Sequence, residues 1–208
     1  MIDLKDIEAI IFDLGGVIIN IDYQLTIDAF ERLGVQNFIQ QYSKKNQSKL
    51  FDLLEVGKIS NEQFVQTIKN DLKISHCSNH QIVNAWNSLL LDFPVKRLNL
   101  LKELKQKFKT FLLSNTNNIH IDAFQKILKN QTGYASLDPY FHKVYFSSKI
   151  GFRKPDNDVF EYVLSHHNLV PNKTLFIDDS IQHIVAAKKL GIQTHHLKDT
   201  EDIVTLLS

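Results

Sequence analysis

Five short apolar runs, separated by helical patterns, constrain the fold of this chain more than any other feature of its sequence. The runs cover residues 9–12, 110–113, 143–146, 174–177 and 193–197. Apolar residues recur at helical spacing over 98–108, 119–128, 159–166, 181–190 and 200–207. Strands buried on both faces read as short apolar runs, and strands that alternate with helices favour a parallel sheet. The sequence therefore predicts an α/β fold with a doubly wound, Rossmann-like parallel sheet.

The first two runs are separated by an unusually long stretch, residues 20–94. This stretch has no clear strand pattern, and its apolar residues recur at helical spacing over 24–33, 44–54, 61–72 and 81–91. A simple crossover between parallel strands is much shorter. We therefore expect a core formed by residues 1–19 and 95–208, and an inserted alpha-helical cap domain formed by residues 20–94, placed over the mouth of the crevice that follows the first strand.

One turn inside this insertion carries its own signals. Gly57 suits the end of one helix, and Ser60 with Gln63 suits a capping box at the start of the next. The segment Gly57-Lys58-Ile59 would then form the tip of a helical hairpin. The tip is either an ordinary turn or a part of the chain that reaches into a functional site.

Polar residues follow the predicted strands of the core. Asp13 ends the first strand, residues 114–117 follow the second, and Asp178 and Asp179 follow the fourth. Lys154 comes shortly after the third strand. Because the carboxyl ends of parallel strands meet at one edge of a sheet, we expect these side chains to converge on one crevice.

The residue types in this crevice favour phosphoryl chemistry. Three carboxylates at one place would raise each other's pKa values unless a cation lay among them, and oxygen ligands suit Mg²⁺. Lys154 and the hydroxyl of Ser114 suit the binding of a phosphate. Asp13 is then a candidate nucleophile, because a carboxylate can form an aspartyl phosphate. An isolated acid at a strand end usually caps a turn or a helix, so the joint order of these residues carries the prediction.

Four motifs, taken in order, resemble the haloacid dehalogenase superfamily of aspartyl-phosphate hydrolases. They are Phe12-Asp13-Leu14-Gly15-Gly16-Val17, Leu113-Ser114-Asn115, Lys154-Pro155, and Phe176-Ile177-Asp178-Asp179-Ser180 followed by Ala186-Ala187 and Leu190-Gly191. The helical insertion is similar to the alpha-helical cap of that family. Closer still, Ser114-Asn115-Thr116-Asn117 and Gly57-Lys58-Ile59-Ser60 resemble the bacterial alpha-D-glucose-1-phosphatase subgroup, which also carries a glycine two positions after the nucleophile.

The resemblance implies a role for each metal-binding position. Asp13 would be the nucleophile and a Mg²⁺ ligand, and Gly15 would bind the ion through its backbone carbonyl. Asp179 would be a further ligand, and Asp178 would be either a second ligand or an outer partner.

The resemblance also implies a phosphate-binding set. Ser114 and Lys154 would bind the transferring phosphoryl group, with Lys154 offsetting the charge on Asp13. Asn115 would contribute to the phosphate pocket. The substrate would be a small phosphorylated metabolite, with a sugar phosphate as the favoured class.

One departure from the family pattern bears on the chemistry. Most family phosphatases carry an aspartate as general acid and base where this chain has Gly15, and a general acid typically contributes about 10²–10⁴-fold in rate. The remaining machinery would suit an ester with a good leaving group, such as a sugar 1-phosphate. Water or another residue would take the missing role. His120 is one candidate, but we expect it to be a surface or capping histidine; His183 either supports the site or faces solvent.

Two alternative functions remain. A 2-haloacid dehalogenase also lacks the second carboxylate, but it needs no metal, and Asp178 with Asp179 argues against it. The other alternative is a phosphate-ligand or partner-binding protein with weakened catalysis, which only Gly15 suggests.

Composition narrows the range of partners. The net charge is +1, which favours neither nucleic acid nor a membrane surface. The basic stretch from Lys96 to Lys109 predicts an amphipathic helix with a solvated basic face. The single cysteine, Cys77, suits a reducing compartment, and no signal peptide or membrane-spanning run is apparent. We expect a cytoplasmic protein, either a monomer or a weak homodimer.

Overall fold

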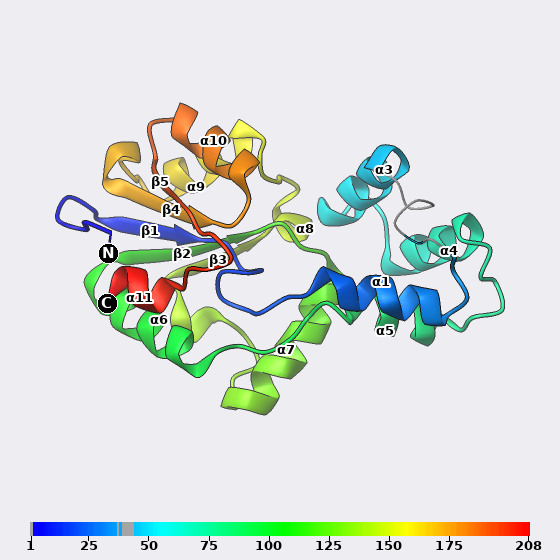
Figure 1. Ribbon diagram of the computed structural model, residues 1–208. Coiled ribbons are helices and arrows are strands. Elements are labelled where there is room, and N and C mark those ends of the chain that lie inside the picture. The colour runs from blue at the N-terminus through cyan, green and yellow to red at the C-terminus, as the bar shows by residue number, and fades with distance from the viewer. Residues whose placement is uncertain (1, 37, 39–43) are drawn as a thin grey trace.

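A five-stranded parallel sheet forms the centre of the computed structural model, which describes residues 2–36, 38 and 44–208 (Figure 1). The strands are β1 (Ala9–Phe12), β2 (Lys109–Ser114), β3 (Lys143–Phe146), β4 (Thr174–Asp178) and β5 (Gln193–His196). Their order across the sheet is β3-β2-β1-β4-β5, and every neighbouring pair is parallel. The predicted parallel α/β fold is confirmed.

The central strand β1 shows why the sheet is covered on both faces. All four of its residues are buried, and successive side chains of a strand point to opposite faces. Ile10 and Phe12 pack in one hydrophobic cluster, whereas Ala9 and Ile11 pack in another.

Each cluster is completed by a different set of helices. The face of Ile10 is covered by α6 (Val95–Lys107), α7 (Asn118–Thr132) and α11 (Ile203–Leu207). The face of Ile11 is covered by α9 (Asn157–His166) and α10 (Ile181–Lys189). Figure 1 shows α9 and α10 above the sheet and α6 and α11 below it, which is the doubly wound arrangement expected from the sequence.

The long insertion folds as helices. They are α1 (Tyr23–Arg32), α3 (Lys44–Glu55), α4 (Asn61–Asp71) and α5 (Asn79–Asn87). They share a second hydrophobic core, in which Phe30, Phe64, Ile68 and Ile82 are fully buried and Cys77 is buried too; Ile119 of α7 also packs in it. The predicted capping box of Ser60 and Gln63 is present at the start of α4.

The two ends of the insertion lie side by side. Asn20 N–H donates to the carbonyl of Asp92 at 2.9 Å, and Leu91 N–H donates to the carbonyl of Asn20 at 3.0 Å. Figure 1 shows the helices of the insertion grouped beside the sheet. A second core and paired connections support the predicted cap, while its status as an independent domain stays a prediction.

One expectation about the surface is wrong at a single residue. The basic stretch from Lys96 to Lys109 covers α6 and the first residue of β2, and its lysines are exposed or half-buried, but Arg97 is buried instead of solvated. Its guanidinium bonds the carboxylate of Asp202 at 2.9 Å and the side-chain oxygen of Asn20 at 3.0 Å. The sequence pattern did not reveal these distant partners. None of the described helices is both long enough and apolar enough to cross a membrane.

Candidate active site

The turn after β1 places Asp13 at the edge of the sheet. The backbone N–H of Asp13 still donates to Ile177 on β4, at 2.9 Å, so the ladder fixes the start of the turn. Gly16 then adopts a φ of 70°, a conformation that favours glycine. A Cβ at Gly16 would lie 2.6 Å from Oδ2 of Asp179, so any larger residue would push the Asp179 carboxylate away from this position.

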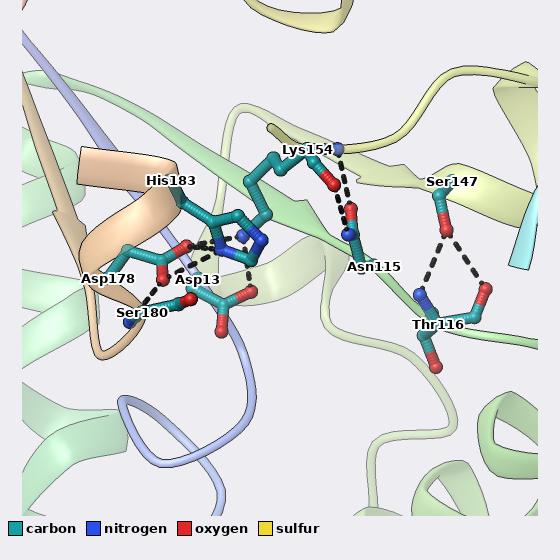
Figure 2. Close-up of polar contacts among 8 residues, drawn as sticks. All are labelled: Asp13, Asn115, Thr116, Ser147, Lys154, Asp178, Ser180 and His183. Atoms are coloured by element: carbon teal, nitrogen blue, oxygen red, sulfur yellow. Dashed lines mark hydrogen bonds and ion pairs between the residues drawn. The ribbon is translucent and has the colours of Figure 1, made fainter. Parts of the chain in front are cut away.

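Lys154 joins two of the predicted carboxylates. Its side chain is fully buried, and its Nζ lies 2.7 Å from Oδ1 of Asp13 and 2.6 Å from Oδ2 of Asp178 (Figure 2). Burial, together with repulsion from the neighbouring aspartates, raises the pKa of Asp13 against the attraction of Lys154. Burial alone would raise the pKa of Asp178, but Lys154 and His183 hold it below its ordinary value. The structure therefore assembles these residues from three separate segments, as the sequence predicted.

Asp178 is surrounded by hydrogen-bond donors. The N–H of Ser180 donates to its Oδ1 at 2.8 Å, and Nδ1 of His183 lies 3.0 and 3.1 Å from its two oxygens (Figure 2). Of the two roles considered for His183, contact with the site is the one that the structure supports. Asp179, the next residue, is exposed, and one carboxylate oxygen from each of Asp13, Asp178 and Asp179 lies within 4.8 Å of the other two.

Asn115 holds the backbone of Lys154. Its amide nitrogen donates to the Lys154 carbonyl at 2.7 Å, and its oxygen accepts from the Lys154 N–H at 2.9 Å (Figure 2). This pair of bonds makes Asn115 a support for Lys154, and its place in the phosphate pocket stays a prediction.

The segment after β2 is held by a residue that the sequence analysis did not identify. Ser147 accepts from the Thr116 N–H at 2.9 Å and donates to the Thr116 carbonyl at 3.1 Å (Figure 2). Ser147 begins α8 (Ser147–Ile150), a helix that the sequence did not predict, and its place directly after β3 was the available signal. Ser114 is buried at the end of β2.

A cavity of about 600 Å³ lies between this edge of the sheet and the helical insertion. Its sheet-side wall includes Gly15, Ser114 and Asn115. Most of its other wall comes from the insertion, and the residues that matter below are Tyr23, Phe51, Asp52, Glu55 and Trp86.

Three stacked aromatic rings connect the insertion to the core at the cavity wall. They belong to Phe51, Trp86 and His120, and we call them the ring stack. The Phe51 and Trp86 rings lie 5.0 Å apart at 12°, and the Trp86 and His120 rings lie 5.2 Å apart at 16°. The ring stack therefore joins α3 and α5 of the insertion to α7 of the core.

Both ring nitrogens of His120 are engaged. Nε2 lies 3.2 Å from the carbonyl of Trp86, which can only accept, so Nε2 carries the hydrogen. Nδ1 then accepts from the amide of Asn117 at 3.2 Å, and burial lowers the pKa of His120 to about 4. Asn117 caps α7 by accepting from the His120 N–H, so His120 lies at the start of the helix as expected but is not itself the cap. The expected surface position is wrong, because α5 covers the ring.

Arg153, which also lines the cavity, ties the insertion to the core. Its NH1 lies 2.5 Å from Oδ1 of Asp52, and its Nε and NH2 lie 3.0 and 2.8 Å from Oε2 of Glu55. These three residues were missed in the sequence, where the position of Arg153 directly before Lys154 was the only signal.

The hairpin tip of the insertion contacts the core nearby. A Cβ at Gly57 would lie 2.5 Å from the carbonyl oxygen of Ser148 on α8, so the two backbones touch. Of the two readings of the segment Gly57-Lys58-Ile59, the structure supports a turn packed on α8, because these residues do not line the cavity.

Known proteins share both the sequence and the architecture. Residues 7–191 match the model of the haloacid dehalogenase-like hydrolase family. A D-ribitol-5-phosphate phosphatase of Bacteroides thetaiotaomicron is 29% identical over 196 residues, which cover 94% of each chain. A phosphorylated carbohydrates phosphatase of Thermotoga maritima is 24% identical, over 92% of this chain and 88% of its own length.

A solved structure is similar over nearly the whole chain. It is a haloacid dehalogenase family enzyme of Bacteroides thetaiotaomicron, in complex with magnesium and inorganic phosphate. It is 34% identical, has a TM-score of 0.88, and the similarity covers 97% of this chain and 100% of that one. This chain belongs to the haloacid dehalogenase-like hydrolase family. The predicted membership is confirmed, and the narrower resemblance to the alpha-D-glucose-1-phosphatase subgroup stays a prediction.

Proposed function

We propose that this protein is a Mg²⁺-dependent phosphatase of a small phosphomonoester, a sugar or polyol phosphate, acting through an aspartyl phosphate on Asp13. The observation that carries the proposal is the buried Lys154 shared between Asp13 and Asp178, with an oxygen of Asp179 within 4.8 Å. The phosphatase names of two relatives and the magnesium and phosphate in the similar structure support it.

The described residues fit a magnesium ion. Mg²⁺ prefers carboxylate and carbonyl oxygens and keeps several waters. Asp13, Asp179 and the carbonyl of Gly15 would hold it, because the oxygens of Asp178 already accept from Lys154, His183 and Ser180. We therefore place Asp178 as an outer partner. When bound, the ion neutralises charge on the transferring phosphoryl group.

The side chains of the site have distinct roles in the rest of the reaction. An oxygen of Asp13 attacks phosphorus, and Lys154 favours the anionic form of Asp13 that this attack needs. Lys154 and the hydroxyl of Ser114 also bind phosphoryl oxygens. Asn115 keeps Lys154 in place through its two backbone bonds.

The alternatives have less support. A metal-free dehalogenase gains nothing from the cluster of Asp13, Asp178 and Asp179. A binding protein with weakened catalysis does not account for the two ion pairs of the fully buried Lys154. The predicted cytoplasmic location, the absence of a nucleic-acid or membrane partner, and the monomer or weak homodimer stay predictions.

Phosphate release tests the proposal. The chain is incubated with and without Mg²⁺ on D-ribitol 5-phosphate, glucose 6-phosphate, glucose 1-phosphate and nitrophenyl phosphate. We expect Mg²⁺-dependent release that falls to background in Asp13→Asn. Release that is equal in the parent chain and Asp13→Asn would contradict the proposal, and metal-free halide release from 2-chloropropionate would favour the dehalogenase.

A further inference from the structure

The cavity has no carboxyl group at position 15, and the structure shows what takes its place. A Cβ at Gly15 would lie 3.2 Å from Cδ1 of Ile21, and both residues line the cavity. An apolar side chain therefore occupies the space beyond Gly15. A group that protonates a leaving oxygen has to come from another part of the cavity wall.

Five ionisable side chains line the cavity among the residues that the structure describes: Tyr23, Asp52, Glu55, His120 and Arg153. A guanidinium group does not serve as a general acid, which sets Arg153 aside. His120 has both ring nitrogens engaged and is neutral. Partial enclosure of the hydroxyl, and then the carboxylates of Asp179, Asp13 and Glu55, raise the pKa of Tyr23 to about 12, far from neutral pH.

The two remaining groups differ in their surroundings. Asp52 and Glu55 lie three residues apart on α3, and both contact Arg153. The side chain of Asp52 is 44% exposed, whereas that of Glu55 is 25% exposed. Both contacts from Arg153 to Glu55 go to Oε2, so Oε1 has no hydrogen-bond donor within the described part of the chain.

Burial of Glu55 favours its protonated form more than the neighbouring charges oppose it. Burial raises its pKa, and Asp52 adds to this, while Arg153 and then His183 act in the opposite direction; the net shift is upward. Tyr23 is the other titratable group near it. A carboxyl group with a raised pKa keeps its proton closer to neutral pH, as a general acid requires.

We propose that Glu55, from the helical insertion, is the general acid and base that replaces the carboxyl group missing at Gly15. The inference rests on the proposed phosphatase function. In the first step an oxygen of Asp13 bonds to phosphorus, the bond to the leaving oxygen breaks, and that oxygen takes its electron pair and the proton of Glu55. The products are the alcohol, the aspartyl phosphate and the Glu55 carboxylate.

The second step restores the site. The Glu55 carboxylate takes a proton from water as the water oxygen bonds to phosphorus, and the bond between phosphorus and Asp13 breaks. Inorganic phosphate leaves, Asp13 is again a carboxylate, and Glu55 is again protonated.

The test compares leaving groups before and after Glu55→Gln. Gln keeps an oxygen that accepts from Arg153, so the contact between α3 and the core is retained. With the faster of D-ribitol 5-phosphate and glucose 6-phosphate, single-turnover alcohol release is expected to fall about 10²-fold or more. With nitrophenyl phosphate, whose leaving oxygen needs no proton, the initial burst is expected to change less than about 3-fold, while later turnover slows because water attack lacks a base. In the parent chain, the rate of alkyl phosphate hydrolysis should fall as pH rises. The Glu55→Gln variant should not show this fall.

Asp52→Asn is the matched control, because Asp52 shares the contact with Arg153. Asp52→Asn should either slow the hydrolysis of alkyl phosphates and of nitrophenyl phosphate by the same factor or leave both rates unchanged. Equal loss of both first steps in Glu55→Gln, or the selective loss in Tyr23→Phe instead, would overturn the inference. A parent chain that hydrolyses no substrate would contradict the proposed function itself.

Discussion

Lys154 is the residue around which the site is built. A buried ammonium group is tolerated only when anions and hydrogen bonds surround it, and removal of one partner typically costs about 3–5 kcal/mol. Lys154 has Asp13 and Asp178 at its side chain and Asn115 at its backbone. These contacts fix one position for the ammonium group at the edge of the sheet.

The support from Asn115 gives a first prediction. Asn115→Ala removes both bonds to the Lys154 backbone, so the free energy of unfolding should fall by about 1–3 kcal/mol. The rate of phosphate release should fall by at least about 10-fold, because a small displacement of Lys154 weakens a geometry that the reaction needs. Urea unfolding and kcat on nitrophenyl phosphate measure the two effects.

Asn130→Ala is the control for this change, because Asn130 is exposed on the same helix that follows Asn115. It should leave stability and rate nearly unchanged. An Asn115→Ala chain with the stability and rate of this control would show that Lys154 needs no support from Asn115.

The residue scale also shows where sequence reasoning reaches its limit. Asp13, Lys154 and Asp178 were predictable as neighbours, because parallel topology alone brings strand ends together. The residues that support the site were harder to predict. Ser147 contacts Thr116 and His183 contacts Asp178, and no short sequence motif specifies these contacts. The position of Glu55 on the cavity wall could not be predicted from the sequence, because it depends on how the insertion packs on the core.

At the scale of elements, the junction of α5 and α7 depends on a neutral histidine. The pKa of His120 is lowered to about 4 in the folded protein, below its ordinary value near 6.5. Between these pH values the unfolded chain binds a proton and the folded chain does not, so stability rises with pH across this window. The contribution is complete above about pH 6.5 and is lost as pH falls toward 4.

We therefore expect His120→Gln to flatten this dependence, because the Gln amide still donates toward Trp86 but does not titrate. The difference in the free energy of unfolding between the two chains should change by at most about 3 kcal/mol between pH 7 and pH 4. Chemical unfolding at several pH values measures it. His166→Gln, at an exposed position, should keep the pH profile of the parent chain; identical profiles for all three chains would contradict the prediction.

Elements were predictable where their burial is complete. Strand β1 is buried at all four residues, and its apolar run marked it correctly. The helix α8 has only four residues, too few for a periodic pattern, and it was missed. The solvated face expected for α6 was partly wrong because the ion pair of Arg97 with Asp202 links residues 105 positions apart.

At the scale of the whole molecule, the insertion meets the core through both apolar and polar contacts. The ring stack supplies apolar contacts, and Arg153 with the backbone of Gly57 supplies polar ones. The placement of the insertion over the crevice was expected, since it follows Asp13 directly in the chain. The contacts that set its position were not expected, because they join segments far apart in the chain: 34 residues for Trp86 and His120, and 101 for Arg153 and Asp52.

Gly57→Ala tests the contact between the hairpin tip of the insertion and α8. Gly57 has a φ of 70° and Gly34 a φ of 94°, so an alanine at either position should cost about 1–2 kcal/mol of stability. Only at Gly57 would the new methyl group meet the core, 2.5 Å from the Ser148 oxygen, whereas nothing lies within 4 Å at Gly34. Gly57→Ala should therefore also lower kcat/KM by about 10-fold or more, by displacing α3 from the cavity.

Gly34→Ala is the matched control for backbone strain. Urea unfolding and kcat/KM on nitrophenyl phosphate are measured for both variants. Equal kcat/KM values would mean that the contact between the hairpin tip and α8 has no part in catalysis.

The ring stack gives the molecule a built-in optical reporter. Trp86 is the only tryptophan of the chain, and its indole lies between Phe51 of the insertion and His120 of the core, on the wall of the cavity. The tryptophan fluorescence therefore comes from a single place, the contact between the insertion and the core. Any event that separates the insertion from the core or fills the cavity changes the surroundings of that one ring. Intrinsic fluorescence thus follows these events with no attached dye.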